Sequence, residues 1–305
     1  ARRLANKKYL VYITGSNAKM LSRDIQTVLG GRFLDALIYP YTFAEYLAAS
    51  GVALEKEWQY GGQRAVVQKL FADYMKWGGF PELLLFRNKR NWLNSLYDKI
   101  LLGDIIQRNK VKNENALRLT MKRLAENVMQ PISYNRIANV IRTTGTSIAV
   151  SSVSDYVRYA VDACMIFSLE NYASKFVEKE TVKKHYFVDN GLLSIFLLDG
   201  NTALLENLCA IHLHKKYGDK LYFYNKNIEV DFLIVDEGYA VQVSYSIYGD
   251  GKQETFDRET KALVQLDKYL SLNRMIIVTY DEEGVVTLDN GKQIEVIPVW
   301  KWLLE

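Results

Sequence analysis

The sequence predicts a multidomain α/β protein with a parallel sheet near its start and a second α/β segment at its end. Residues 9–47 alternate short apolar strands with helices, and residues 187–305 alternate strands and helices again. Between them, residues 52–109 repeat apolar side chains with the 3.6-residue period of amphipathic helices. A length of 305 residues suits two or three domains rather than one.

The first stretch places a polar turn at the end of a buried strand. In order, it predicts an apolar strand at 9–13, a polar turn at 14–17, a helix at 19–29, a Gly-Gly stop followed by Arg32, and a second strand at 33–39. In open α/β sheets, ligands lie beyond the carboxyl ends of the strands. Ser16 and Asn17 are therefore candidates for ligand contact.

The phrases YITGSN, GR and PYTFAEYL in this stretch resemble the second half of the nucleotide-binding core of bacterial and archaeal AAA-type ATPases. The resemblance implies that Asn17, with Ser16 beside it, is the sensor that touches the γ-phosphate or the attacking water. It also implies that Arg32 is an arginine finger serving a neighbouring subunit, and hence that the protein forms a homo-oligomer. The alternative is a strand, turn and helix packed for stability alone.

The phosphate-binding loop that such ATPases need is not in the sequence. No G-x-x-x-x-G-K-[ST] motif occurs, and no apolar strand ending in Asp-Glu precedes Tyr9. We expect the chain to be truncated before its Walker A and Walker B regions. ATP and Mg²⁺ are then the cofactors of the full-length protein, and this chain alone is expected to hold none and to hydrolyse no ATP.

The resemblance divides the chain into four segments. Residues 1–50 correspond to a remnant of the parallel-sheet P-loop ATPase core, and 51–111 to its helical lid, marked by the phrase GGFPE at 78–82. Residues 112–186 predict a winged helix-turn-helix. Residues 187–305 resemble a restriction-endonuclease-like α/β domain and open with the phrase FVDNGLL.

The winged-helix prediction rests on three helices followed by two strands. The helices are expected at 116–129, at 134–142 with Ser133 as N-cap, and at 153–163 capped by Ser151 or Ser152; the strands are expected at 165–172 and 183–188, with a turn or wing tip at 176–181. Arg158, Lys183 and Lys184 are the candidate nucleic-acid contacts. They suffice for phosphates but offer little for reading bases, so DNA and protein stay open as alternative partners.

The last segment carries a constellation similar to that of PD-(D/E)XK nucleases. Glu206 lies on a predicted helix, Asp231 on a strand, and Gln242 and Ser244 on one face of the next strand. The resemblance implies that Asp231 and an acidic or amide residue hold Mg²⁺ and that a lysine two positions later activates water. Here Gln242 is a neutral ligand and Ser244 replaces that lysine, so we expect a degenerate site without a metal.

Charge, cysteine content and hydropathy limit the possible partners and cellular location of the protein. Formal net charge is +4, which permits a nucleic-acid partner without requiring one. The two cysteines match no metal or redox spacing, no apolar run reaches the length of a membrane span, and no secretory signal is visible. We therefore expect a cytoplasmic protein without a membrane partner.

The function that the sequence favours is an AAA-type ATP-binding protein of unknown cellular role with an inactive nuclease-like C-terminal domain. One alternative is a non-enzymatic module that binds DNA or protein. A second alternative is a working metal-dependent nuclease.

Overall fold

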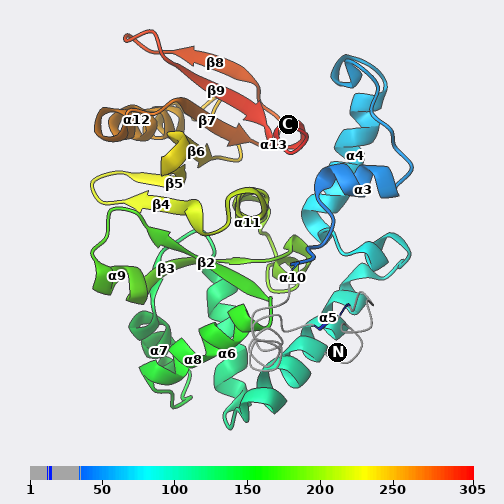
Figure 1. The fold of residues 1–305 in the computed structure, drawn as a ribbon, viewed down its shortest axis with the longest axis vertical. Helices are drawn as coiled ribbons and strands as arrows, with labels where there is room; N and C mark the ends of the chain where they lie inside the picture. The colour runs from blue at the N-terminus through cyan, green and yellow to red at the C-terminus, as the bar shows by residue number, and fades with distance from the viewer. Residues whose placement is uncertain (1–11, 13, 16–33, 35) are drawn as a thin grey trace.

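A computed structural model describes residues 12, 14, 15, 34 and 36–305, which form a mixed α/β structure (Figure 1). Within these residues, nine strands make one sheet in the order β1-β3-β2-β4-β5-β6-β7-β9-β8. The strands are β1 (Ile132–Ser133), β2 (Ile166–Asn171), β3 (Val182–Phe187), β4 (Leu221–Asn225), β5 (Glu229–Ile234), β6 (Tyr239–Val243), β7 (Arg274–Thr279), β8 (Gly284–Thr287) and β9 (Gln293–Pro298).

Eleven α-helices accompany the sheet in the described part of the chain. They are α3 (Phe43–Ala49), α4 (Gln63–Trp77), α5 (Lys89–Lys99), α6 (Glu114–Glu126), α7 (Tyr134–Thr143), α8 (Val150–Asp162), α9 (Phe176–Thr181), α10 (Asn190–Ser194), α11 (Asn201–Tyr217), α12 (Gln253–Leu270) and α13 (Val299–Trp302). A π-helix, η3 (Ile100–Gln107), continues α5, and the short 3-10 helices are η1 (Trp58–Tyr60), η2 (Pro81–Leu84), η4 (Gly218–Lys220) and η5 (Val235–Glu237).

Most of the AAA-like stretch lies outside the described residues. This holds for Ser16, Asn17 and Arg32, and for the predicted helix at 19–29. The second strand, expected at 33–39, is not seen at residues 34 and 36–39, which have no regular structure, so the prediction is wrong for that part.

The described helices begin with α3, whose start the sequence encodes locally. Thr42 accepts a hydrogen bond from the backbone N–H of Glu45, whose carboxylate accepts one from Thr42 N, so the two form a capping box. Phe43 then packs against the rings of Phe71 and Tyr74 on α4. This buried aromatic contact fixes α3 on α4.

Helices α6, α7 and α8 adjoin the three strands β1, β3 and β2, and β1 lies between α6 and α7 in the chain. β3 pairs antiparallel with both β1 and β2. Ser133 caps α7 by accepting a hydrogen bond from Arg136 N, as predicted. The cap expected at Ser151 or Ser152 is wrong, because α8 starts earlier, after Ala149, and contains both serines. The expected turn at 176–181 is the short helix α9.

The C-terminal strands continue the same sheet. β2 pairs with β4 in parallel through Glu170–Tyr222 and Asn171–Phe223, and β4, β5 and β6 then run antiparallel. β7 and β9 follow in parallel, with β8 antiparallel at the edge. The boundary expected between residues 186 and 187 falls inside β3.

One hydrophobic core runs through all these parts. Its buried side chains extend from Phe43 on α3 to Leu303 after α13, and a second, smaller cluster lies beneath α12. α11 lies near the centre of the molecule, beside the sheet, where it contacts β3, β4 and β6 (Figure 1). Most of its residues are buried, which puts its polar side chains into the interior.

Candidate functional site: a buried lysine among carboxyl groups

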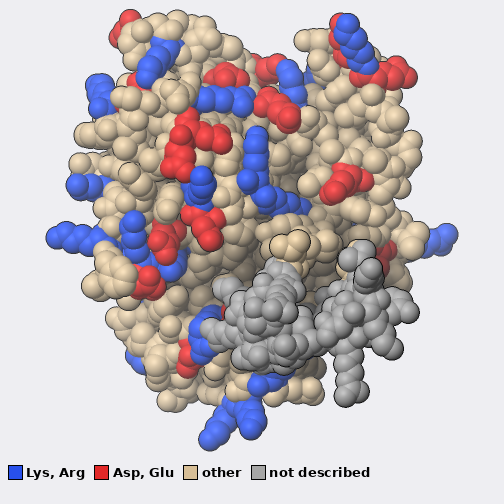
Figure 2. Space-filling model, in the orientation of Figure 1, with Lys and Arg blue, Asp and Glu red and all other residues tan. Residues whose placement is uncertain are grey.

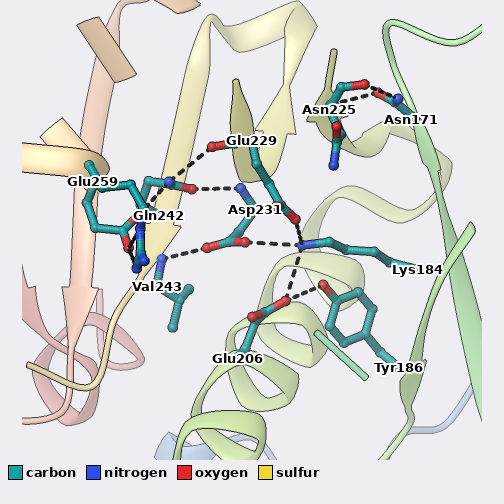
Figure 3. A network of polar contacts seen from close by, with 11 residues as sticks. Asn171, Lys184, Tyr186, Glu206, Asn225, Glu229, Asp231, Gln242, Val243 and Glu259 are labelled. Carbon is teal, nitrogen blue, oxygen red and sulfur yellow. Dashed lines mark hydrogen bonds and ion pairs between the residues drawn. The ribbon is translucent and has the colours of Figure 1, made fainter. Parts of the chain in front are cut away.

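The most concentrated set of buried charges surrounds Lys184 (Figure 3). Its Nζ lies 3.1 Å from Oδ1 of Asp231, 3.2 Å from Oε1 of Glu229 and 3.4 Å from Oε1 of Glu206. The lysine side chain is 0% exposed, and those of Asp231 and Glu206 are 14% and 6% exposed. We call Lys184, Glu206, Glu229 and Asp231 the lysine–carboxylate cluster. One ammonium group thus faces three carboxyl groups.

Strand periodicity and one helix bring these groups together. Glu229 and Asp231 are two apart on β5, so both side chains leave the same face of the strand. Lys184 and Tyr186 are likewise two apart on β3, and both reach Glu206 of α11. The Tyr186 hydroxyl donates to Glu206 Oε1 at 2.7 Å.

A second contact holds α11 against β3. The side chain of Asn207 accepts a hydrogen bond from Phe187 N at 2.8 Å and donates one to Phe187 O at 3.1 Å. This side chain therefore satisfies both backbone groups of one strand residue. It fixes the position of α11 along β3, and therefore the place where the neighbouring Glu206 contacts Lys184.

Asp231 and Gln242 bridge β5 and β6 just past the end of their ladder. Backbone pairing between these strands runs from Ile234–Tyr239 to Phe232–Val241. Beyond it, Asp231 Oδ2 accepts from Val243 N at 3.0 Å, and the Gln242 side-chain oxygen accepts from Asp231 N at 2.8 Å. Both side chains thus satisfy backbone donors.

The other two predicted nuclease positions face away from Lys184. The Gln242 amide nitrogen donates to Glu259 Oε2 at 2.7 Å and to the Glu229 carbonyl at 3.2 Å. The Ser244 hydroxyl donates to the carbonyl of Ser246 at 3.3 Å, within the loop after β6. The structure therefore brings the carboxyl groups of Glu206 and Asp231 to Lys184, while Gln242 contacts the backbone of Asp231 and Glu229 and the Ser244 hydroxyl contacts Ser246.

Burial and charge act in opposite directions on the pKa values of the cluster. Burial alone lowers the pKa of Lys184, but Glu206, Asp231 and Glu229 together outweigh it and raise that pKa, so the ammonium stays charged. Burial raises the pKa of Glu206 to about 8, although Lys184 and the Tyr186 hydroxyl lower it. Glu206 therefore keeps its proton to a higher pH than an exposed glutamate does.

The cluster does not have the form of a metal site. In the described part of the chain, no three or more His, Cys, Asp and Glu side chains are arranged to hold a metal ion. Two of the three carboxyl groups that would be nearest, those of Glu206 and Asp231, accept hydrogen bonds from Lys184, Tyr186 and Val243 N instead. The implied Mg²⁺ therefore does not fit the residues as they stand.

The three predicted nucleic-acid residues are all ion-paired within the chain. Lys184 is fully buried, which rules out a phosphate contact in this conformation and corrects the expected surface role. Lys183 lies 3.1 Å from Glu170, and Arg158 lies 2.7 Å from Asp155. Figure 2 shows acidic and basic side chains interspersed on one face of the described residues, without a broad basic area.

The three phrases PYTFAEYL, GGFPE and FVDNGLL meet in space. Asp189 Oδ2 accepts from Gly79 N at 2.7 Å, and its Oδ1 accepts from Gly191 N at 2.8 Å. Tyr41 N donates to the Gly79 carbonyl at 2.8 Å. Asn190 donates to the Met75 carbonyl at 2.8 Å. We call this contact the three-segment junction. Burial raises the pKa of Asp189 to about 6, against the lowering effect of these backbone donors.

Comparison with protein families agrees with the AAA-type assignment of the first segment. Residues 1–47 match the model of the AAA domain, and residues 68–203 match a domain of unknown function (DUF8612). Asn17, Ser16 and Arg32 all fall within the AAA match. No solved structure matches the chain.

Two relatives match nearly the whole chain. The uncharacterized protein MJ1544 of Methanocaldococcus jannaschii is 31% identical over 317 residues, covering 99% of this chain and 70% of its own length. An uncharacterized protein of Haemophilus influenzae is 31% identical over 304 residues, covering 97% of this chain and 71% of its own length. The chain therefore belongs to the family of these proteins. In its described part, no helix is long and apolar enough to cross a membrane.

Sequence reasoning missed the partners of Asp231. Glu229 could have been found, because the spacing E-x-D on one strand puts both carboxyl groups on one face. Tyr186 and Lys184 show the same spacing on β3. No sequence signal says that β3 faces α11 and β5, since this depends on the pairing of β2 with β4.

Proposed function

We propose that this protein is an AAA-type ATP-binding protein, an ATPase in its complete form, whose C-terminal segment has the arrangement of a PD-(D/E)XK nuclease and does not cut. The observation that carries the first half is the AAA-domain match over residues 1–47, which contains the sensor-like Asn17 and the finger-like Arg32. Its cofactors are ATP and Mg²⁺, and Arg32 would serve the site of a second copy.

The second half rests on the order and pairing of the C-terminal elements. α11 carries Glu206, β4–β5–β6 form an antiparallel meander with Asp231 on its middle strand, and α12 leads to β7 in parallel with β6. This order supports a nuclease-like core for residues 187–305. A nuclease of this type needs a lysine ammonium near the attacked phosphate. Ser244 stands at the position of that lysine and has no ammonium group.

The ATPase proposal is tested on the protein encoded by the complete reading frame. Phosphate release from ATP should fall by at least about 100-fold in Asn17→Ala and in Arg32→Ala, since each removes a group that acts on the transition state. Arg23→Ala is the matched control and should keep full activity. Each variant is then mixed with a copy of the protein that keeps Arg32 but is itself inactive. This copy should restore the ATPase activity of Arg32→Ala but not that of Asn17→Ala. Equal activity of all variants would contradict the proposal.

A binding role is the second candidate, and the α6–α7–α8 arrangement with β1–β3–β2 favours it. Three helices and a three-stranded antiparallel unit are what a winged helix requires. Of the three candidate contacts, Arg158 is the most exposed, at 58%; it is paired with Asp155 of its own helix and lies over the Tyr159 ring. DNA binding should therefore be weak, tolerant of sequence and steeply dependent on salt.

Fluorescence anisotropy with duplex and single-stranded DNA separates the DNA and protein alternatives. Arg158→Glu should weaken binding of every DNA sequence alike, whereas Lys220→Glu, distant in sequence and paired with Asp236, should not. A strong preference for one duplex, unchanged by Arg158→Glu, would show that another surface reads DNA. No binding of any DNA would favour a protein partner.

A further inference from the structure

The position of Lys184 in the fold explains how a nuclease-like core can dispense with a metal. Its ammonium reaches the carboxyl groups of α11 and β5 from β3, which lies outside the helix and meander that make up that core (Figure 3). Beneath it lies the ring of Phe223, 5.6 Å from Nζ to the ring centroid. The ammonium is therefore in contact with three carboxyl groups, one of them hydrogen-bonded to Tyr186, and with an aromatic face.

Holding the largely buried carboxyl groups of Glu206 and Asp231 beside that of Glu229, whose side chain is 38% exposed, needs a positive charge. Without one, repulsion and desolvation would cost several kcal/mol for each ionised group. Lys184 supplies the charge by ion pairs of 3.1 to 3.4 Å, and Tyr186 adds a hydrogen bond to the most deeply buried carboxyl group. Glu206 and Asp231 are thus satisfied by the chain itself, whereas Glu229 Oε1 has an ion pair with Lys184 and, within the described residues, no hydrogen bond.

We propose that Lys184 provides, from within the chain, the positive charge that a divalent cation provides in the nucleases that this domain resembles, and that it closes the cluster to metal. This inference rests on the nuclease-like arrangement proposed above and deepens it. It also distinguishes Lys184 from the water-activating lysine of an active nuclease. A side chain that is 0% exposed and bound to three carboxyl groups cannot reach a phosphodiester.

The inference makes opposite predictions for the wild type and for a variant without the charge. Lys184→Met keeps the length and apolar stem of the side chain and removes the ammonium. Wild-type protein should bind no Mn²⁺ at the cluster. Lys184→Met should bind one Mn²⁺ there, with a dissociation constant at least about tenfold lower than that of any Mn²⁺ ion that the wild type binds. Lys183→Met, the neighbouring residue on the opposite face of β3, should behave as wild type.

Mn²⁺ binding is measured by electron paramagnetic resonance of the free ion, and thermal unfolding is recorded with and without Mn²⁺. The midpoint of Lys184→Met should rise with Mn²⁺, and that rise should vanish in Lys184→Met/Asp231→Asn. A folded Lys184→Met protein that binds no Mn²⁺ would overturn the inference. If this variant does not fold unaided, Mn²⁺ should restore its cooperative unfolding, and failure to do so would also count against it.

The wild-type titration needs no variant to fold. Mn²⁺ bound by wild-type protein and lost in Asp231→Asn would show that the cluster accepts metal beside Lys184, which contradicts the inference. The ATPase proposal is independent of all these results, because ATP hydrolysis by the complete protein depends on the N-terminal segment. Loss of one proposal therefore leaves the other standing.

Discussion

Single side chains decide what the C-terminal segment can do, and Lys184 is the first of them. Removing one partner of a buried ion pair leaves the others without compensation. Lys184→Met should therefore lower the free energy of unfolding by about 3–5 kcal/mol without added metal, as measured by urea denaturation. Lys183→Met should cost about 1 kcal/mol or less, since its ion pairs with Glu170 and Glu180 lie near the surface. Equal costs for the two variants would contradict the importance of the buried cluster.

His185, next to Lys184 on β3, predicts a pH dependence of stability. Burial, and to a smaller extent Lys183, lowers its pKa from 6.5 to about 3, while its Nδ1 lies 2.8 Å from the Ser168 hydroxyl. Between these two values the unfolded chain binds a proton that the folded chain does not. The stabilising contribution is therefore full above pH 6.5 and is lost as the pH falls towards 3.

This dependence is measured as a difference between two proteins. From pH 6 to pH 4, the free energy of unfolding of the wild type should fall more steeply than that of His185→Gln, by up to about 1.4 kcal/mol per pH unit. The comparison is needed because burial also lowers the pKa of His212, to about 4, and so adds to the slope in both proteins. Parallel slopes would show that His185 takes up its proton in the folded state.

At the scale of elements, the three-segment junction ties α3, α4 and α10 together through glycines. Gly78 has φ +80°, and a Cβ on it would lie 1.8 Å from Asp189 Oδ1. Gly78→Ala should therefore cost several kcal/mol of unfolding free energy, through both the strained backbone and the displaced carboxylate. The matched control is Gly103→Ala in η3, where a Cβ would meet no atom within 4 Å. Thermal unfolding of the two variants checks this, and a mild effect of Gly78→Ala would contradict the geometry.

The elements themselves were largely predictable, because each depends on local periodicity. The apolar period of α8, the alternation on β5 and the Ser133 cap of α7 are all readable from neighbouring residues. The errors are local too. Ser151 and Ser152 are good capping residues, but Ala149 already has extended backbone and α8 starts after it. Residues 176–181, predicted to be a turn or wing tip, form the short helix α9.

The site was predictable only in part. Glu206 and Asp231 were implied by the resemblance to the PD-(D/E)XK constellation, and in the structure both contact Lys184. The assignment of Lys184 to a surface failed because charge patterns suggest solvent exposure, while burial depends on which strand lies over α11. Such long-range pairing, here of β2 with β4, leaves no local signature.

At the scale of the whole molecule, the continuous sheet makes the C-terminal segment dependent on β3. A fragment of residues 187–305 would lose Lys184 and Tyr186 and leave Glu206 and Asp231 without their partners. It should therefore lack a cooperative unfolding transition at neutral pH, whereas a fragment of residues 36–305, which keeps β1 to β3 and the three-segment junction, should show one by circular dichroism. A cooperative transition in the shorter fragment would mean that the cluster is not needed for folding.

We expect the C-terminal segment, proposed above to be nuclease-like, to bind no metal at the lysine–carboxylate cluster and to cut no DNA, and a cleavage assay checks this. Wild-type protein is incubated with plasmid or single-stranded DNA and Mg²⁺ or Mn²⁺, with Asp231→Asn as the matched control, and the products are resolved on gels. We predict no cleavage above that of the control, because Lys184 holds the carboxyl groups and Ser244 supplies no ammonium. Metal-dependent cleavage by the wild type that disappears in Asp231→Asn would contradict the account and establish a working nuclease.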